Sequence, residues 1–293
     1  HHQMFYFQDG THIFKAENLL FRVHKSVLCD KSITFKEMFT ANEDSEAILH
    51  PVDGASDTES IIVPNQVTTA AFKLFLLVCY NKWHPDTSQV SENIICQLLE
   101  LGQMYQSKVV HDHTISQLNA CHWSIDASWL ISIALKYHIK DIFHYAFNQM
   151  VPRYLNQLGD SDFDHLTEPV WKVLLWVKEQ LEFHHHIVAC EPPEMVHSPN
   201  CKNGQECNND WQQLWWNGMG RFLLDGHNPL PYSEVVEQFQ GLCYGGVHLD
   251  CWRAMLSLIK AGKAFCHEHI LIDQTSQGLA ELLIFKPFLD EDL

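Results

Sequence analysis

The sequence predicts an α+β fold, in which a small β-sheet flanked by helices is followed by a mainly α-helical C-terminal extension. Near the amino terminus, short apolar groups have the spacing of a β-hairpin, and later segments repeat apolar residues at helical intervals. Hydrophobic residues make up 46% of the 293 residues, which is ample for a buried core. We place a first domain at residues 1–150 and the helical extension at residues 151–293.

The first predicted elements are a hairpin and two short helices. Residues 11–23 group their apolar side chains on either side of Glu17 and Asn18, as two strands joined by a tight turn require. In residues 24–39 the apolar spacing becomes helical, and the polar run at residues 30–32 separates two helices. The chain therefore passes from a strand pair directly into helices.

A loop, a short strand and a helix come next. Residues 42–59 contain six acidic residues and no Lys or Arg, which is typical of a solvated surface loop. Residues 61–63 have the composition of a short strand. Thr68 or Thr69 can cap the helix that follows, which turns one apolar face toward the core.

The rest of the chain is predicted to be mainly helical. Residues 81–126 form an enlarged connection, with one helix at residues 94–105 between polar, His-rich segments. Two amphipathic helices at residues 129–137 and 139–150 pack as a helical hairpin. Cap and stop residues bound three later helices, which begin near Thr167, Asn209 and Asp250 and end near His184, Gly226 and Gly262.

A specific motif spans the end of the hairpin. Asp9 comes first, then Phe21-Arg22-Val23-His24-Lys25-Ser26-Val27-Leu28, and then Ser32, Phe35, Met38 and Phe39. This order resembles the opening of the BTB/POZ domain, whose signature is an acidic residue, a hairpin, Phe-x-Val-His-Lys-x-x-Leu, a Ser, and an aromatic residue leading into Met-Phe. Residues 61–64, 72–80 and 134–150 look like the family's third strand, its next helix and its closing helical pair. The resemblance covers about the first half of the chain.

The second half is similar to extensions found on many BTB proteins of mushroom-forming fungi. This similarity rests on residues 201–226, with Trp211 and Trp215-Trp216-Asn217-Gly218, and on the turn at residues 229–232. The family resemblance implies a protein-interaction domain that is often dimeric. In some members it is a substrate adaptor for cullin-3 ubiquitin ligases or a transcriptional regulator. We therefore expect a non-enzymatic scaffold that binds other proteins, including a second copy of itself or a cullin.

Two departures from the family pattern bear on this expectation. Family dimers commonly use a helix and a strand before the first hairpin, whereas about eight residues precede Asp9 here. The usual swapped dimer is therefore not expected to be inherited. The connection at residues 81–126 is longer than the usual one and is expected to alter the surface where a cullin would dock.

The composition argues against several classes of protein. There are 36 acidic residues against 19 Lys and Arg, and the net charge of -17 without a basic run disfavours nucleic-acid binding. No apolar stretch approaches the roughly 20 residues of a membrane-spanning helix, and no secretory signal is evident. Ten cysteines spread without a dense framework favour reduced thiols in an intracellular protein, cytoplasmic or nuclear.

Four potential metal ligands lie in or beside a loop rich in Pro and Asn. They are Cys190, His197, Cys201 and Cys207. Thiolate and imidazole groups are zinc ligands, and the spacing permits a tetrahedral site, although it matches no standard paired pattern. The alternative is that the cysteines are reduced and pack as small apolar side chains. No other cofactor is expected.

Trp216 is the candidate contact residue for a partner protein. Trp211 and Trp215 share an apolar helix face, whereas Trp216 points elsewhere. The alternative function is a hydrolase or a zinc-dependent enzyme built on the extension. The sequence has no Gly-x-Ser-x-Gly and no phosphate loop, and the run at residues 266–269 is expected at the surface. We therefore name no catalytic residue, and only a cleft with two converging ionisable groups would favour the enzyme.

Overall fold

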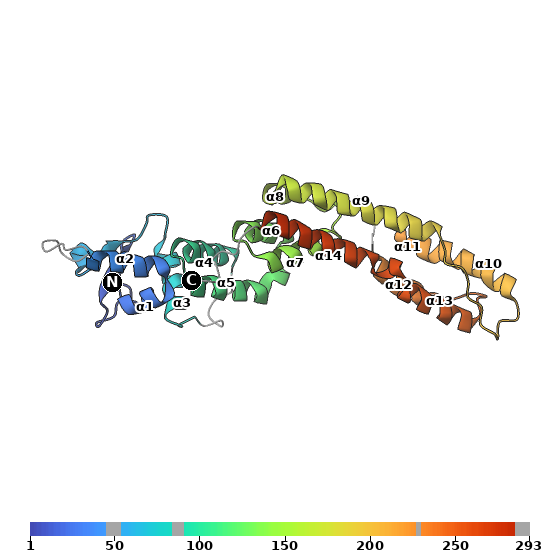
Figure 1. The fold of residues 1–293 in the computed structure, drawn as a ribbon, viewed down its shortest axis with the longest axis horizontal. Helices are drawn as coiled ribbons and strands as arrows, with labels where there is room; N and C mark the ends of the chain where they lie inside the picture. The colour runs from blue at the N-terminus through green and yellow to red at the C-terminus, as the bar shows by residue number, and fades with distance from the viewer. Residues whose placement is uncertain (45–53, 84–90, 227–229, 285–293) are drawn as a thin grey trace. The chain divides into compact units, whose positions relative to one another are not determined.

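The computed structural model describes residues 1–44, 54–83, 91–226 and 230–284 (Figure 1). Part of the predicted acidic loop, residues 45–53, lies outside the described residues. The chain divides into two compact units, of which the first ends at Ile125 and the second begins at Asp126. Each unit has a hydrophobic core of its own.

The first unit is built around a three-stranded sheet. Strands β1 (His12–Ala16) and β2 (Leu19–Val23) form the predicted antiparallel hairpin. Strand β3 (Ile61–Ile62) pairs with β1 in parallel, which gives the order β2-β1-β3. Glu17 in the turn has a φ of 50°, the left-handed conformation that this tight connection requires.

The amino-terminal residues lie along the outer edge of β2. Phe7 N–H donates to the Arg22 carbonyl at 2.9 Å, and Arg22 N–H donates to the Phe5 carbonyl at 2.9 Å. Tyr6 forms a parallel bridge with Arg22, and the Phe5 side chain is fully buried. These residues therefore extend the sheet of their own chain.

Helices supply the remainder of the first unit. They are α1 (Lys25–Lys31), α2 (Ile33–Asp44), α3 (Thr69–Cys79), α4 (Glu92–Met104) and α5 (Lys108–Cys121), with short 3₁₀ turns η1 (Asp57–Glu59) and η3 (His122–Ser124). The break between α1 and α2 falls at Ser32, as predicted. Thr68 Oγ1 caps α3 by accepting from Ala71 N–H at 3.1 Å, which settles the choice between the two threonines.

Helix α5 lies where the sequence predicts a polar, His-rich connection, so that prediction is wrong for these residues. The buried face of α5 combines Val110 and Leu118 with His111 and Thr114, and the two polar side chains obscure the apolar periodicity. Thr114 Oγ1 donates to the Val110 carbonyl at 2.7 Å, so its hydroxyl is satisfied within the helix. A Cβ on Gly102 of α4 would lie only 3.4 Å from His111 N, so Gly102 permits the close approach of α4 and α5.

Phenylalanine side chains fill the core of the first unit. Phe14 and Phe21 from the hairpin lie against Phe72 of α3, with ring centroids 5.8 and 5.1 Å apart. Phe35 of α2 packs against Phe75 of α3 at 6.1 Å. Burying each such side chain stabilises the fold by roughly 1.5–3 kcal/mol. The cluster therefore holds the sheet against the helices and forms the core of this unit.

The second unit is helical, and its longest helices are α9 and α14 (Figure 1). Its elements are α6 (Ala127–Lys136), α7 (Lys140–Met150), η4 (Leu155–Gln157), α8 (Asp160–His165), α9 (Glu168–Cys190), α10 (Gly204–Leu214), the π-helical segment η5 (Trp215–Gly220), α11 (Arg221–Leu223), α12 (Tyr232–Gln240), α13 (Leu249–Ala261) and α14 (Lys263–Leu283). None of the helices in the described part of the chain has both the length and the apolar content that crossing a bilayer requires.

Helices α6 and α7 form the predicted helical hairpin but belong to the second unit. Helix α6 also packs on α8, and α7 packs along α14. Because of these contacts the second unit begins at Asp126, whereas the boundary predicted from the sequence follows Met150. The family resemblance places this helical pair in the first domain. It cannot show the contacts with distant helices, because it rests on local motifs.

Three helix boundaries in the second unit can be compared with the predicted cap and stop residues. Helix α9 continues past the polar run at residues 184–186 to Cys190. Helix α10 begins at Gly204 with Asn203 as its N-cap, not near Asn209. Helix α13 ends before Gly262, as predicted. Polar residues such as His184 and Asn209 therefore lie inside these helices and do not mark their ends.

Tryptophan side chains dominate the core of the second unit. Trp211 and Trp215 are each 1% exposed, and both pack against Phe239 of α12. Their ring nitrogens are satisfied by backbone carbonyls, since Trp211 Nε1 donates to Pro193 at 3.0 Å and Trp215 Nε1 donates to Ala189 at 3.1 Å. The predicted core positions of these two tryptophans are confirmed.

Candidate functional site

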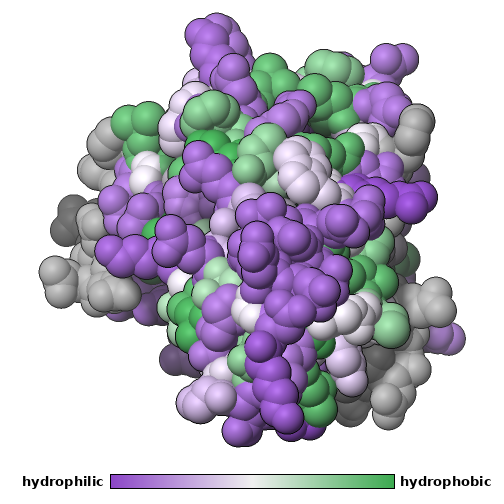
Figure 2. All heavy atoms as spheres, turned by 90° about the vertical axis from the view of Figure 1, so that its right-hand side faces the viewer, coloured by the Kyte–Doolittle hydropathy of each residue, from purple (hydrophilic) through white to green (hydrophobic). Residues whose placement is uncertain are grey.

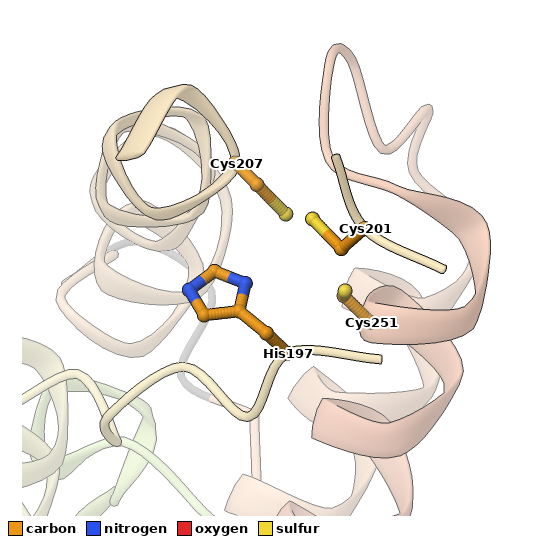
Figure 3. A group of neighbouring side chains, drawn as sticks. All are labelled: His197, Cys201, Cys207 and Cys251. Atoms are coloured by element: carbon orange, nitrogen blue, oxygen red, sulfur yellow. The ribbon is translucent and has the colours of Figure 1, made fainter. Parts of the chain in front are cut away.

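Four potential metal ligands gather in the second unit beside α10 and α13 (Figure 3). His197, Cys201, Cys207 and Cys251 each offer one ligand atom, and all these atoms lie within 4.8 Å of one another. The three sulfur atoms and one ring nitrogen of His197 point toward the same small space. Cys207 and Cys251 are buried, whereas His197 is exposed, so the group meets solvent on the His197 side.

Two helix starts and one loop position these side chains. Cys207 lies near the start of α10, and Cys251 lies in the first turn of α13. His197 and Cys201 come from the loop at residues 191–203, which has no regular secondary structure. Within the loop, Cys201 N–H donates to the Ser198 carbonyl at 2.9 Å and closes a turn. The loop therefore brings two ligands to two helices that are distant in sequence.

Backbone N–H groups point at two of the sulfur atoms. Ser198 N–H donates to Cys251 Sγ at 3.2 Å, and His248 N–H donates to Cys207 Sγ at 3.4 Å. Burial raises the pKa of the Cys207 thiol to about 11, and the nearby Cys201 and Cys251 thiols add to the increase. This thiol is therefore protonated at neutral pH, and a bound cation would reverse that preference.

The structure brings together three of the four residues that the sequence suggested. Cys190 lies at the carboxyl end of α9, is exposed and is not part of the group, and Cys251 supplies the fourth ligand atom. Cys190 is close to His197 in sequence, but the ring of His197 turns toward the start of α10 instead. No local spacing identifies Cys251, because it follows Cys207 only after α12. A sequence signal did exist in its position near the start of a helix, where thiolates are favoured.

Trp216 is half-exposed at 51%, in contrast to the buried Trp215 beside it. Its ring lies against Gly220, where an added Cβ would be 3.3 Å from Trp216 Cε3. Both residues belong to η5, a π-helical segment, and such segments occur frequently at functional sites. The geometry fits the predicted contact role, which stays a prediction.

A cavity of about 690 Å³ in the second unit is lined by several ionisable groups, including His185 and Glu268. His185 Nε2 and Glu268 Oε1 are 2.6 Å apart, and Glu268 Oε2 accepts from Tyr232 N–H at 3.0 Å. Glu268 is only 6% exposed, so the expectation that residues 266–269 all lie at the surface is wrong for this residue. The carboxylate joins α9 and α14 to the start of α12, where a negative charge is favourable.

Lys178 also lines this cavity, and its position has a structural explanation. Its Nζ donates to the carbonyls of Met150, Val151 and Arg153 at the carboxyl end of α7 and beyond. Burial lowers the pKa of Lys178 to about 8. A cation at the end of a helix satisfies carbonyls that have no partner within the helix. Lys178 and Glu268 at the cavity wall therefore each contact the end of a helix.

One further group combines the residue types of a nucleophilic site. Ser276 Oγ and His144 Nδ1 are 2.5 Å apart, and His144 Nε2 lies 3.6 Å from Asp273 Oδ1. Ser276 is 0% exposed, so its hydroxyl cannot meet a substrate in this conformation. The group lies where α7 packs on α14, and its role is to satisfy polar atoms between the two helices.

In the first unit, the motif around His24 has a structural role. His24 precedes α1, and its backbone N–H donates to Tyr80 Oη at 2.8 Å while its ring Nδ1 lies 3.0 Å from the same oxygen. Asp9 Oδ2 lies 3.4 Å from His24 Nε2. The motif therefore fixes the junction between the hairpin and the first helix against the end of α3.

A comparison with known protein families finds a domain whose bounds lie close to those of the first compact unit. The sequence model of the BTB/POZ domain matches residues 9–122, and the first compact unit ends shortly after this match, at Ile125. A comparison with curated proteins finds no match. The family match and the sheet, helices and motif described above agree over the same residues. The family model thus assigns a BTB/POZ domain to residues 9–122 of this chain.

Proposed function

We propose that the chain is a non-enzymatic scaffold that recruits proteins through its BTB/POZ domain and serves as a substrate adaptor for a cullin-3 ubiquitin ligase. The observation that carries this proposal is the family match over residues 9–122, because BTB/POZ domains mediate protein–protein interactions. The net charge of -17 also favours protein partners over nucleic acids. In this proposal the domain binds the ligase and the second unit binds the protein to be modified.

Trp216 is the proposed anchor for the recruited protein. Half-exposed tryptophans are favoured anchors because a large apolar ring becomes buried when the partner binds. Trp176 of α9 is exposed to a similar degree in the same unit, so it can serve as a control for Trp216.

The ligase proposal is tested by measuring solution mass. Light scattering is recorded for the full chain without any tag, alone and mixed with the amino-terminal domain of a cullin-3. We expect a stable complex whose mass is the sum of its components. The Trp216→Ala variant should form the same complex, because Trp216 lies outside residues 9–122. If the two proteins keep their separate masses, the adaptor role is wrong, and a dimer of the chain would leave a self-associating scaffold or a transcription-linked regulator.

The anchor is tested with a matched pair of tryptophan variants. Trp216 and Trp176 are 51% and 47% exposed in the same unit. Proteins retained from a cell extract by the immobilised chain are quantified for the wild type, Trp216→Ala and Trp176→Ala. We expect Trp216→Ala to weaken retention of a specific partner at least about tenfold, and Trp176→Ala to keep it. Equal retention by Trp216→Ala and the wild type would remove Trp216 from the interface.

An intracellular location, cytoplasmic or nuclear, accompanies this proposal. None of the ten cysteines, all of which lie in the described part of the chain, forms a disulfide, as expected of thiols in a reducing compartment. The alternative of a hydrolase or a zinc-dependent enzyme gains no support: His185 and Glu268 converge at the cavity, but their side chains are buried, Glu268 is engaged by the start of α12, and Ser276 is buried. Fluorescence microscopy of the chain expressed in cells checks the location, and a purely extracellular signal would contradict it.

A further inference from the structure

We propose that His197, Cys201, Cys207 and Cys251 bind one zinc ion, which fastens the loop at residues 191–203 to helices α10 and α13. The four ligand atoms already lie within 4.8 Å of one another. Zinc bonds of about 2.3 Å to sulfur and about 2.0 Å to nitrogen place tetrahedral ligand atoms roughly 3.5–3.8 Å apart. Only a small contraction of the group therefore separates it from a zinc site.

The donor set selects the class of metal. Three thiolates and one imidazole are soft or borderline ligands, which suit zinc and do not suit magnesium or calcium, since those ions bind oxygen. Each of the four residues offers one ligand atom, so the protein fills a tetrahedral coordination shell by itself. A zinc ion without an open coordination position is structural and is not a catalyst.

Two backbone N–H groups are placed to stabilise sulfur ligands once a cation has ionised them. The N–H groups of Ser198 and His248 donate to Cys251 Sγ and Cys207 Sγ at 3.2 and 3.4 Å. Such hydrogen bonds stabilise the negative charge of a coordinating thiolate and hold the ligand in place. Both buried cysteines also lie near helix starts, where the helix dipole favours negative charge.

The imidazole ring of His197 lies against Gly204 at the start of α10. A Cβ at Gly204 would be in ordinary van der Waals contact with the ring, 3.4 Å from Nε2 and 3.5 Å from Cε1. The ring nitrogen that faces the sulfur atoms is then held in the direction that coordination requires (Figure 3). The histidine thus occupies the solvent side of the group, where it completes the shell of ligands.

A structural metal ion would fasten the loop at residues 191–203 to the helices beside it. The loop at residues 191–203 lacks regular secondary structure, and its attachment to the helices uses few hydrogen bonds, among them Val196 N–H to Met255 Sδ at 3.2 Å. Hydrophilic side chains cover most of the front of this end of the unit (Figure 2). Met195 and Cys201 pack against the core of the unit, whereas Val196 is 49% exposed, so apolar burial holds only part of the loop and a metal ion would fasten the rest.

The first test is the metal content of the purified full chain. The protein is produced in zinc-supplemented medium without a tag, with His1 and His2 replaced by Ala so that the amino terminus adds no adventitious ligand, and is dialysed before elemental analysis. We expect about one zinc per chain. Cys251→Ser and Cys207→Ser should lose most of this zinc, while Cys190→Ser, which changes an exposed cysteine outside the group, should keep it.

The second test does not depend on how well the variants fold. Wild-type protein is stripped of metal under reducing conditions and titrated with cobalt(II), which takes the place of zinc. A three-thiolate, one-imidazole site gives strong visible bands of tetrahedral cobalt and sulfur-to-cobalt charge transfer at one equivalent. Cys190→Ser should give the same spectrum. Addition of zinc should abolish the bands, because zinc binds thiolates more tightly than cobalt does.

Two outcomes would overturn the proposal. One is wild-type protein that contains no stoichiometric zinc, gives no tetrahedral cobalt spectrum and leaves the three thiols open to alkylation when unfolded. The cysteines would then be reduced apolar side chains. The other is a disulfide between two of the three cysteines, seen by mass spectrometry of the freshly isolated protein without reductant, because a disulfide would use two of the ligands.

Discussion

The two units satisfy their buried polar groups in different ways. In the first unit, serine hydroxyls bond to backbone carbonyls of segments distant in sequence: Ser32 Oγ donates to the Tyr105 carbonyl at 2.5 Å, and Ser107 Oγ donates to the Lys31 carbonyl at 2.6 Å. In the second unit, side chains from distant helices bond to each other. The His185–Glu268 pair at 2.6 Å is the clearest case.

This difference explains why only one unit is recognisable from a motif. A hydroxyl that bonds to a backbone carbonyl does not depend on which side chain the partner residue carries, so the motif around Ser32 can be recognised without knowing its partner. A pair such as His185 and Glu268 works only when both partners are present, and they come from α9 and α14. The same holds for Cys207 and Cys251. The second unit is thus specified by contacts between distant residues.

The largest effect is expected from Phe72→Ala, which tests whether the two units unfold independently. Phe72 is fully buried and packs against Phe14, Phe21 and Phe75. Removing the ring leaves a cavity and should lower the free energy of unfolding of the first unit by about 3–5 kcal/mol. Calorimetry of the full chain should show one transition shifted and one unchanged.

The control for this prediction is Ile62→Ala in the same unit. Ile62 is 74% exposed, so its truncation should change stability by less than about 0.5 kcal/mol. If Phe72→Ala shifts all transitions of the chain together, the two units unfold as one. Separate free energies of unfolding could then not be assigned to them.

The next largest effect is expected from Glu268→Ala, which removes a buried hydrogen-bond acceptor. His185 and the Tyr232 N–H would both lose this acceptor, and leaving buried donors unsatisfied costs about 3 kcal/mol. Glu268→Gln keeps an oxygen acceptor and should cost less. Hydrogen exchange monitored by mass spectrometry should show faster exchange in α9, α12 and α14. Equal exchange in Glu268→Ala and the wild type would mean that the pair does not stabilise these helices.

Much of the first unit could be predicted from sequence, because its signals are local. The hairpin around Glu17, the helix break at Ser32 and the cap at Thr68 each follow from a few adjacent residues. Helix α5 was missed because His111 and Thr114 occupy its buried face. No apolar periodicity then separates the helix from a polar connection.

The candidate metal site shows the limit of sequence reasoning in the second unit. His197, Cys201 and Cys207 could be proposed from the chemistry of their side chains and their proximity in sequence. Cys251 could not, because only the packing of α13 beside α10 brings its sulfur to the group. Cys190 was chosen for its sequence position, and the direction of α9 carries it elsewhere.

A smaller effect is expected from Asp126→Asn, which isolates one charge at the start of the second unit. Burial raises the pKa of Asp126, but hydrogen bonds from Ser128 and Arg153 outweigh it and lower the pKa to about 2. Because the unfolded value is about 3.9, the charge stabilises the folded state above about pH 4, and this is lost as the pH falls toward 2.

Asparagine still caps α6 but cannot attract Arg153, whose Nη2 lies 2.9 Å from Asp126 Oδ2. The pair is partly exposed, so the difference between the wild type and Asp126→Asn should stay below about 1 kcal/mol at pH 7. Thermal unfolding at a series of pH values checks this: the difference should shrink below pH 4. A difference that persists at pH 2 would assign the effect to the cap and not to the charge.

The smallest effect on stability is expected from Trp216→Ala, and its neighbour provides the contrast. Trp215 is 1% exposed and Trp216 is 51% exposed, although both lie on η5. Trp215→Ala should destabilise the second unit by about 3–5 kcal/mol, and Trp216→Ala should cost clearly less, no more than about 1 kcal/mol. Chemical unfolding of both variants measures the two values. A loss of several kcal/mol for Trp216→Ala would mean that this ring stabilises the fold, and an interface role would then no longer be needed to explain its presence on the surface.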